Sequence, residues 1–256
     1  VRHADDAVHF LKRRWNRLIV PWLFWSLVYA ICKSAMAICR MDMNALYSML
    51  SIESMLAGTH IHLWYLPYAF VLGLAIYKVN RWTSRVNNAV VILTATATGV
   101  LMLVARATEI LPADAPAPLC QWTFGLAAAP LGFAIGRCLV IPSGDVQRWL
   151  LSVVSLGTLL ACIILNSTGS ASVAIPYGLG MTLVCIAYAW RARNDAFATY
   201  VASLSFGVYL LHPLVSFGLQ HLVVASRHYA AFILLTACIS GLITAGLMKT
   251  PLRRFV

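Results

Sequence analysis

The chain changes from charged to apolar within KRRWNRLIVP, residues 12–21, and the apolar character then continues to about residue 39. Four permanent positive charges stand within the first six of these residues. Burying them unpaired would cost several kcal/mol or more, so they need water or a phosphate partner. A cationic cluster at the entry to an apolar segment marks the cytoplasmic end of a membrane span, and it can also serve as a port for an anion.

The composition of the whole chain excludes a soluble globular domain. Of the 256 residues, 61% are hydrophobic and only 11% are charged, and the mean hydropathy is +0.81. This composition predicts an all-α, polytopic helical membrane protein. A membrane barrel is excluded because the apolar segments are continuous and roughly 20 residues long, whereas barrel strands are about 10 residues of alternating character. The formal charge is +11. The basic residues are distributed as they are in proteins that orient themselves in a membrane, so no nucleic-acid partner is expected.

Apolar runs of the length that a bilayer requires predict about eight spans. They lie near residues 18–39, 62–79, 88–105, 121–141, 149–166, 172–190, 199–224 and 230–249. With the amino end in the cytoplasm, 15 basic residues lie on that side: Arg2, Lys12, Arg13, Arg14, Arg17, Lys78, Arg81, Arg85, Arg137, Arg148, Arg191, Arg193, Lys249, Arg253 and Arg254. Only 3 lie on the other side: Arg40, Arg106 and Arg227. This asymmetry predicts a transmembrane helix bundle with both termini in the cytoplasm.

The chain is predicted to form one membrane-embedded domain over residues 1–256, with residues 1–17 as a basic cytoplasmic lead that has no signal-peptide pattern. Prolines mark an external loop at residues 109–118 and an internal turn at residues 142–145. Because the sequence opens at Val1, we expect a fragment of a longer chain, with a valine-coded start or a processed terminus as the alternative. The seven cysteines show no metal or redox spacing, so most are expected to pack inside helices and no metal site is predicted.

Histidine is the side chain on which the functional hypothesis depends, because its proton equilibrium lies near neutral pH. His212 stands about 13 residues into its predicted span. At the rise per residue of an α-helix, this is roughly 20 Å from the cytoplasmic end. Pro213 leaves the carbonyl of Tyr209 without its helical donor, which predicts a kink and a local polar pocket. The alternative is a histidine that only bonds a neighbouring helix.

A second histidine stands where the chain re-enters the membrane, in HIHLWYLP, residues 60–67. His62 and Tyr65 share one helical face at positions i and i+3. Alternatively, Trp64 and Tyr65 are ordinary aromatic residues of the membrane interface. All eight acidic residues lie in loops or flanks, which disfavours a carboxylate proton relay. The sequence also has no G-x-S-x-G, Walker or H-E-x-x-H pattern, which disfavours hydrolase, nucleotidase and metalloprotease functions.

Three motifs, in this order, resemble the integral-membrane acyltransferase 3 family. They are RRWNRL of residues 13–18 with Pro21 and Trp25, HLWYL of residues 62–66, and GVYLLHP of residues 207–213. The resemblance implies an O-acyltransferase that moves an acetyl or other short acyl group from cytoplasmic acyl-coenzyme A to a hydroxyl of a cell-envelope or exported carbohydrate. It implies acyl-coenzyme A as a co-substrate, no permanently bound cofactor, and the bacterial inner membrane as the location.

The same resemblance associates Arg13, Arg14 and Arg17 with binding of the acyl donor. Arginine side chains suit this role, because coenzyme A carries several phosphate charges and guanidinium groups bind phosphates bidentately. Members of the family normally begin with two further spans, the first of which bears a histidine central to catalysis, and this chain starts just after them. His3 and His9 match neither position.

Within the chain, His212 and His62 are the candidate catalytic histidines, with an imidazole taking the proton of the acceptor hydroxyl as it attacks the thioester carbonyl. Trp64, Tyr65 and Tyr209 are expected to shape the cleft. The rival hypothesis is a transporter or flippase for an anionic or sugar-linked substrate, although the sequence shows no repeated halves of the transporter kind. The remaining alternative is a catalytically inactive fragment or a structural subunit.

Overall fold

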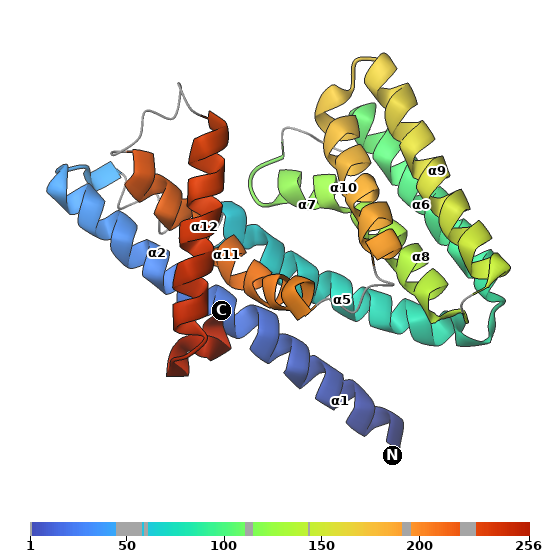
Figure 1. Cartoon of the computed structure of the whole chain (residues 1–256), viewed down its shortest axis with the longest axis horizontal. Coiled ribbons are helices and arrows are strands. Elements are labelled where there is room, and N and C mark those ends of the chain that lie inside the picture. Colours follow the sequence, from blue (N-terminus) through green and yellow to red (C-terminus); the bar gives the residue numbers. More distant parts are fainter. Residues whose placement is uncertain are drawn as a thin grey trace. The chain divides into compact units, whose positions relative to one another are not determined.

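The computed structural model describes residues 2–44, 58, 61–110, 115–142, 144–190, 196–220 and 229–256, which form helices and connections without a strand (Figure 1). In chain order these are α1 (Arg2–Arg14), the π-helical turn η1 (Trp15–Ile19), α2 (Val20–Cys39), η2 (Ile61–Trp64), α5 (Tyr65–Trp82), η3 (Thr83–Arg85), α6 (Asn88–Ala107), α7 (Leu119–Gly125), α8 (Ala128–Val140), α9 (Asp145–Ser167), α10 (Ala171–Trp190), α11 (Ala196–Gln220), α12 (Tyr229–Leu247) and η4 (Pro251–Phe255). Of the residues in the predictions above, His60, Pro112, Asp114, Ser143, Arg191, Arg193 and Arg227 lie outside the described residues, as do the side chains of Arg2 and His3.

Seven helical stretches in the described part of the chain are long and apolar enough to cross a membrane. They are Ala7–Cys39, Asn88–Ala107, Leu119–Val140, Asp145–Ser167, Ala171–Tyr188, Thr199–Gln220 and Tyr229–Leu247. The prediction of an all-α polytopic membrane protein is therefore confirmed. The basic lead is itself helical in its described part, and it continues through η1 into the first of these stretches.

The predicted span at residues 62–79 is the one that these seven stretches do not include. It corresponds to the short helix η2 followed by α5, which is 18 residues long. The last turns of α5 carry Lys78, Asn80 and Arg81, and these polar residues lower the mean hydropathy of so short a helix. The placement of both termini in the cytoplasm requires an even number of spans and stays a prediction.

The chain divides into two compact units, and unit 1 comprises residues 1–67 and 194–256. Its core is made of aromatic and leucine side chains from α2, the η2–α5 junction and α11: Trp25, Tyr29, Leu63, Leu66, Leu210 and Leu211. In α2, the buried residues Pro21, Trp25 and Tyr29 recur every four positions, so they form one stripe along the helix. This stripe determines which face of α2 packs into the core of unit 1.

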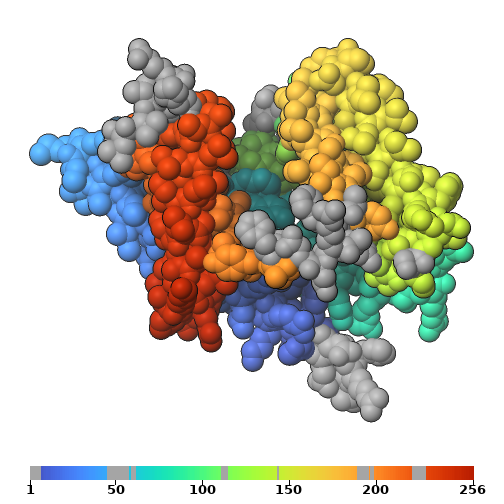
Figure 2. Space-filling view, in the orientation of Figure 1, coloured from blue at the N-terminus to red at the C-terminus, as the bar shows by residue number. Residues whose placement is uncertain are grey.

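Helix α12 of unit 1 has an apolar outer surface and a small polar inner stripe. Figure 2 shows its side chains as an unbroken red column, and its exposed residues include Ile233, Leu234, Leu235, Leu242 and Ile243. On the opposite face Thr236, Ser240 and Thr244 are buried. The two threonine hydroxyls donate to carbonyls of the same helix, so they are satisfied without water. In lipid, polar groups must be satisfied within the protein, and small residues allow close packing against a neighbouring helix. The buried stripe of α12 meets both requirements.

Helices α11 and α12 approach most closely at Gly207. A Cβ atom at this position would lie only 2.3 Å from Cγ2 of Thr244, which is itself fully buried. Only glycine allows the two backbones to come this near without displacing the threonine. The crossing stands less than one helical turn before Tyr209, so it sets the position of the GVYLLHP segment against α12.

We expect Gly207→Ala to destabilise the protein by about 1–3 kcal/mol, the usual cost of adding a methyl group to a packed contact. Gly218→Ala in the same helix is the matched control, because no heavy atom lies within 4 Å of the Cβ that it would add. Thermal unfolding of the two purified variants in one detergent measures the difference. Equal stability of the two variants would show that the crossing does not constrain α11.

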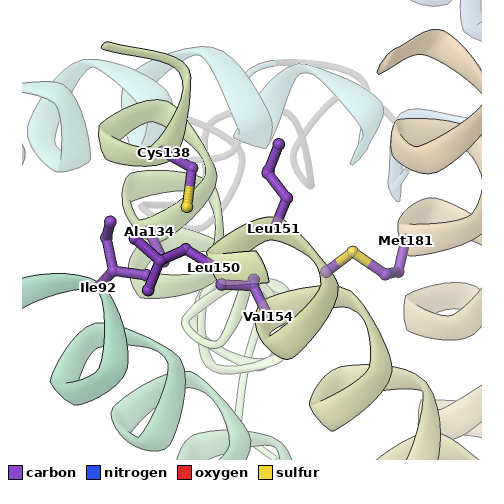
Figure 3. Close-up of a cluster of buried hydrophobic side chains, with 7 residues drawn as sticks. All are labelled: Ile92, Ala134, Cys138, Leu150, Leu151, Val154 and Met181. Atoms are coloured by element: carbon purple, nitrogen blue, oxygen red, sulfur yellow. The ribbon is translucent and has the colours of Figure 1, made fainter. Parts of the chain in front are cut away.

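Unit 2 comprises residues 68–193 and is a helical bundle in which α6 packs on α8 and α9, and α9 packs on α10. Figure 3 shows its buried cluster: Ile92, Ala134, Cys138, Leu150, Leu151, Val154 and Met181. Arg137 of α8 donates to Oδ1 of Asn80 at 3.2 Å and to the carbonyl of Thr83 at 3.1 Å. Gln147, which is 1% exposed, donates to the carbonyl of Cys138 at 3.1 Å. These bonds satisfy polar groups at the ends of unit 2 helices.

Candidate active site

The two predicted histidines come together in unit 1, where they form a cluster of rings with three tyrosines. The ring centroids of His62 and His212 are 5.6 Å apart with the planes at 70°. His62 also packs edge-on against Tyr29 at 5.1 Å and against Tyr209 at 5.5 Å. Tyr209 in turn meets Tyr65 at 6.0 Å. Residues from α2, from the η2–α5 junction and from α11 therefore meet at one point.

Two tyrosine hydroxyls tie the elements of this cluster together. The Tyr29 hydroxyl on α2 donates to the Leu210 carbonyl on α11 at 2.8 Å, and both residues are buried. The Tyr209 hydroxyl on α11 donates to the carbonyl of His62 in η2. Buried polar groups are costly unless they are bonded, so each tyrosine both fills space and fixes a neighbouring segment. The relative positions of the two imidazole rings are thereby set by the backbone of three elements.

The proline in α11 frees a carbonyl that determines which nitrogen of the His212 ring carries the proton. Pro213 cannot donate to the Tyr209 carbonyl four residues earlier, and that carbonyl lies 2.8 Å from Nδ1 of His212. A carbonyl oxygen only accepts hydrogen bonds, so Nδ1 must carry the proton in this bond. In the neutral ring the lone pair is then on Nε2. His212 is half-buried, so the predicted freed carbonyl serves to orient a potential base.

The three predicted cleft residues also belong to this region. Tyr65 packs on Tyr209 and its side chain is 49% exposed, so it forms the outer edge of the cluster. Trp64 contacts Tyr65 edge-on with the ring centroids 5.9 Å apart. The structure therefore brings His62, His212 and Tyr209 into mutual contact, with Tyr65 joined to them through Tyr209 and Trp64 through Tyr65.

Tyr29 is the member of the cluster that sequence analysis missed. It is 2% exposed and lies midway along α2, so the cluster meets that helix at the middle of the first span. Its signal in the sequence was the spacing of Pro21, Trp25 and Tyr29, which marks one face of the helix. That spacing indicates a buried face but gives no sign that a histidine is packed against it.

The three predicted donor-binding arginines precede α2: Arg13 and Arg14 end α1, and Arg17 lies in η1. Arg13 and Arg17 are exposed, whereas Arg14 is half-buried with its guanidinium 5.3 Å from the ring centroid of Phe10. Arg13 and Arg17 are one turn apart on a continuous helix, so the segment presents a concentrated positive charge. The guanidiniums of Arg13 and Arg17 are at the surface, where a phosphate can reach them.

The chemistry that this arrangement supports is proton transfer by an imidazole in an aromatic, half-buried setting. A histidine with Nδ1 bonded to a carbonyl and Nε2 unprotonated is in the tautomer that a general base requires. Within the described residues, no three histidine, cysteine or acidic side chains come together as metal ligands would.

A comparison with protein families finds one whose model is described as an acyltransferase domain, of the acyltransferase 3 type, and it matches residues 2–247. The matched region contains the arginine segment, η2 and nearly all of the helices, including α11. No match was found among curated proteins or among solved structures.

Proposed function

The chain belongs to the acyltransferase 3 family, which makes it an integral-membrane acyltransferase, and we propose that its donor is acyl-coenzyme A and its acceptor a carbohydrate hydroxyl. The acyl group in this proposal is acetyl or another short chain, and the acceptor is a cell-envelope or exported glycan. The proposed location is the bacterial inner membrane. The observation that carries the proposal is the imidazole of His212, oriented by the Tyr209 carbonyl, in a ring cluster that reaches Tyr29 of α2, the helix that begins directly after the arginine segment.

Helix α2 supports the proposed separation of donor phosphates from the reacting thioester. Val20 begins the helix directly after the arginine segment, and Tyr29 contacts His62. At 1.5 Å per residue these positions are about 14 Å apart along the helix axis. Coenzyme A carries its thioester at the end of a long extended arm, so its phosphates can bind at the arginines while the thioester reaches the ring cluster.

In the proposed reaction, His212 acts as the general base. Nε2 takes the proton of the acceptor hydroxyl while that oxygen attacks the thioester carbonyl and forms the new carbon–oxygen bond. Collapse of the tetrahedral intermediate breaks the carbon–sulfur bond, and the departing thiolate takes the proton back from the imidazolium. His62, packed against the His212 ring at 5.6 Å, limits its rotation. Binding both substrates in an aromatic cleft orients them and keeps water from the thioester.

The family membership favours this function over the rival one, a transporter or flippase. The family model is that of an acyltransferase, and it matches residues 2–247 of the chain. A carrier would use the basic segment and the intramembrane histidines only for binding, and would leave a thioester intact. Consumption of the thioester therefore separates the two functions.

The experiment that tests the proposal uses membranes that contain the protein, acetyl-coenzyme A labelled in the acetyl group, and a purified envelope glycan. We expect labelled glycan and free coenzyme A to appear together in equal amounts, because one acyl group leaves the donor for each one that the acceptor gains. Membranes without the protein are the control. Glycan movement without thioester consumption would support the carrier, and the absence of both would contradict the proposed reaction.

A further inference from the structure

The C-terminal helix η4 forms one wall of a cavity whose other wall is the arginine-bearing segment. The cavity has a volume of about 430 Å³ and is lined by Asn16, Val20, Arg254 and Phe255. Asn16 stands between Arg14 of α1 and Arg17 of η1, and Val20 is the first residue of α2. Figure 1 shows the C-terminal end of the chain beside the junction of α1 and α2, and all of these elements belong to unit 1. The size is within the range of small-molecule sites.

Two contacts hold η4 against α2, and a cap fixes its start. The indole Nε1 of Trp25 donates to the carbonyl of Phe255 at 2.8 Å. The rings of Phe24 and Phe255 are stacked with centroids 4.2 Å apart and planes at 11°. At the start of η4, Oγ1 of Thr250 accepts a hydrogen bond from the amide of Leu252 at 3.2 Å. A short helix that is capped at its start and bonded to α2 at its end gives the side chains it carries a defined position.

Arg254 is therefore a cation that lines the cavity from a helix of defined position. Its guanidinium lies 4.7 Å from the ring centroid of Phe255, an arrangement that leaves its N–H groups directed to the sides. None of the described residues gives Arg254 an acidic partner. The Asn16 amide provides a neutral donor on the facing wall, and Val20 with Phe255 provides apolar surface. A guanidinium and an amide across a cavity of this size suit a phosphate or diphosphate.

We propose that Arg254 and Asn16 bind the phosphate groups of the acyl donor, so that η4 completes a site of which Arg13, Arg14 and Arg17 supply the other part. The inference rests on the proposed function for the identity of the donor. It goes beyond the family match, because residues 248–256 lie outside the matched region. Arginines from the two ends of the chain thus act on one ligand, which explains why η4 is fixed so firmly to α2.

Binding of phosphate compounds to the purified protein tests the inference without requiring turnover. The probes are inorganic pyrophosphate and adenosine 3′,5′-bisphosphate, measured by calorimetry in nanodiscs of phosphatidylcholine alone. We expect Arg254→Ala to weaken binding of both probes about tenfold, the loss of one charge-assisted hydrogen bond. Arg253→Ala is the matched control, because it removes the same charge from the same helix but Arg253 does not line the cavity. It should change affinity by less than about twofold.

Anionic lipid headgroups share the phosphate chemistry and form the second arm of the experiment. A lipid site would leave nucleotide binding unchanged in Arg254→Ala, and would instead show Arg254-dependent retention of phosphatidylglycerol in native mass spectra. That result overturns the inference, as does equal binding by Arg254→Ala, Arg253→Ala and the unmodified protein. Arg254-dependent binding of the nucleotide without acyl transfer would uphold the site and reject the proposed function, so the two failures are distinguishable.

Discussion

Replacing His212 with asparagine is expected to lower kcat by about 10²- to 10⁴-fold, the usual contribution of a general base. The asparagine amide nitrogen can occupy the place of Nδ1 and still donate to the Tyr209 carbonyl, which lies 2.8 Å from the imidazole nitrogen. The amide offers no lone pair at the position of Nε2, so it cannot take the acceptor's proton. The measurements are kcat and KM for acetyl-coenzyme A in membranes, together with thermal unfolding of the purified variant.

His212→Gln separates the chemical role from the structural one. The longer side chain moves its amide away from the Tyr209 carbonyl, so this variant should lose activity and also about 1 kcal/mol of stability. His212→Asn should keep its stability while losing activity. If His212→Asn retains more than about a tenth of the original kcat, His212 is not the base. His62 would then be the remaining histidine of the cluster, and its own asparagine variant would show the larger loss.

Local chemistry explains what could be predicted from the sequence. Hydropathy and charge depend on composition within one segment, so the helices and the basic segment at the start of α2 were predictable from short windows. The Tyr209 carbonyl was predicted to lack its helical donor because proline removes that donor in any fold. The structure shows that His212 Nδ1 makes the replacement bond. His212 and Tyr209 are only three residues apart, so a short window of the sequence contains both.

Contacts between distant segments could not be predicted, because hydrophobic periodicity indicates which face of a helix is buried but not which segment covers it. Tyr29 bonds to Leu210 across 181 positions, and Trp25 bonds to Phe255 across 230 positions. No window of the sequence contains both partners, so neither Tyr29 in the site nor η4 beside the arginines could be predicted.

The double replacement Arg14→Ala and Arg17→Ala is expected to weaken binding of coenzyme A about a hundredfold. Each charge-assisted hydrogen bond to a phosphate contributes about 1.5 kcal/mol at the lower end of its usual range, so losing two predicts about 3 kcal/mol. Arg17 is exposed and Arg14 is half-buried above Phe10, so the change removes no core packing. Calorimetry with coenzyme A and the KM for acetyl-coenzyme A measure the effect, while kcat at saturating donor should change little.

Two further double variants distinguish a phosphate site from a general effect of charge. Replacing Arg81 and Arg85 with alanine removes the same two charges from exposed positions of unit 2, and it should leave donor affinity within about twofold. Replacing Arg14 and Arg17 with lysine keeps both charges but removes bidentate geometry, so affinity should lie between the two alanine doubles. Donor affinity that is the same in all three variants would contradict the assignment, because a true phosphate contact must depend on where the guanidinium stands.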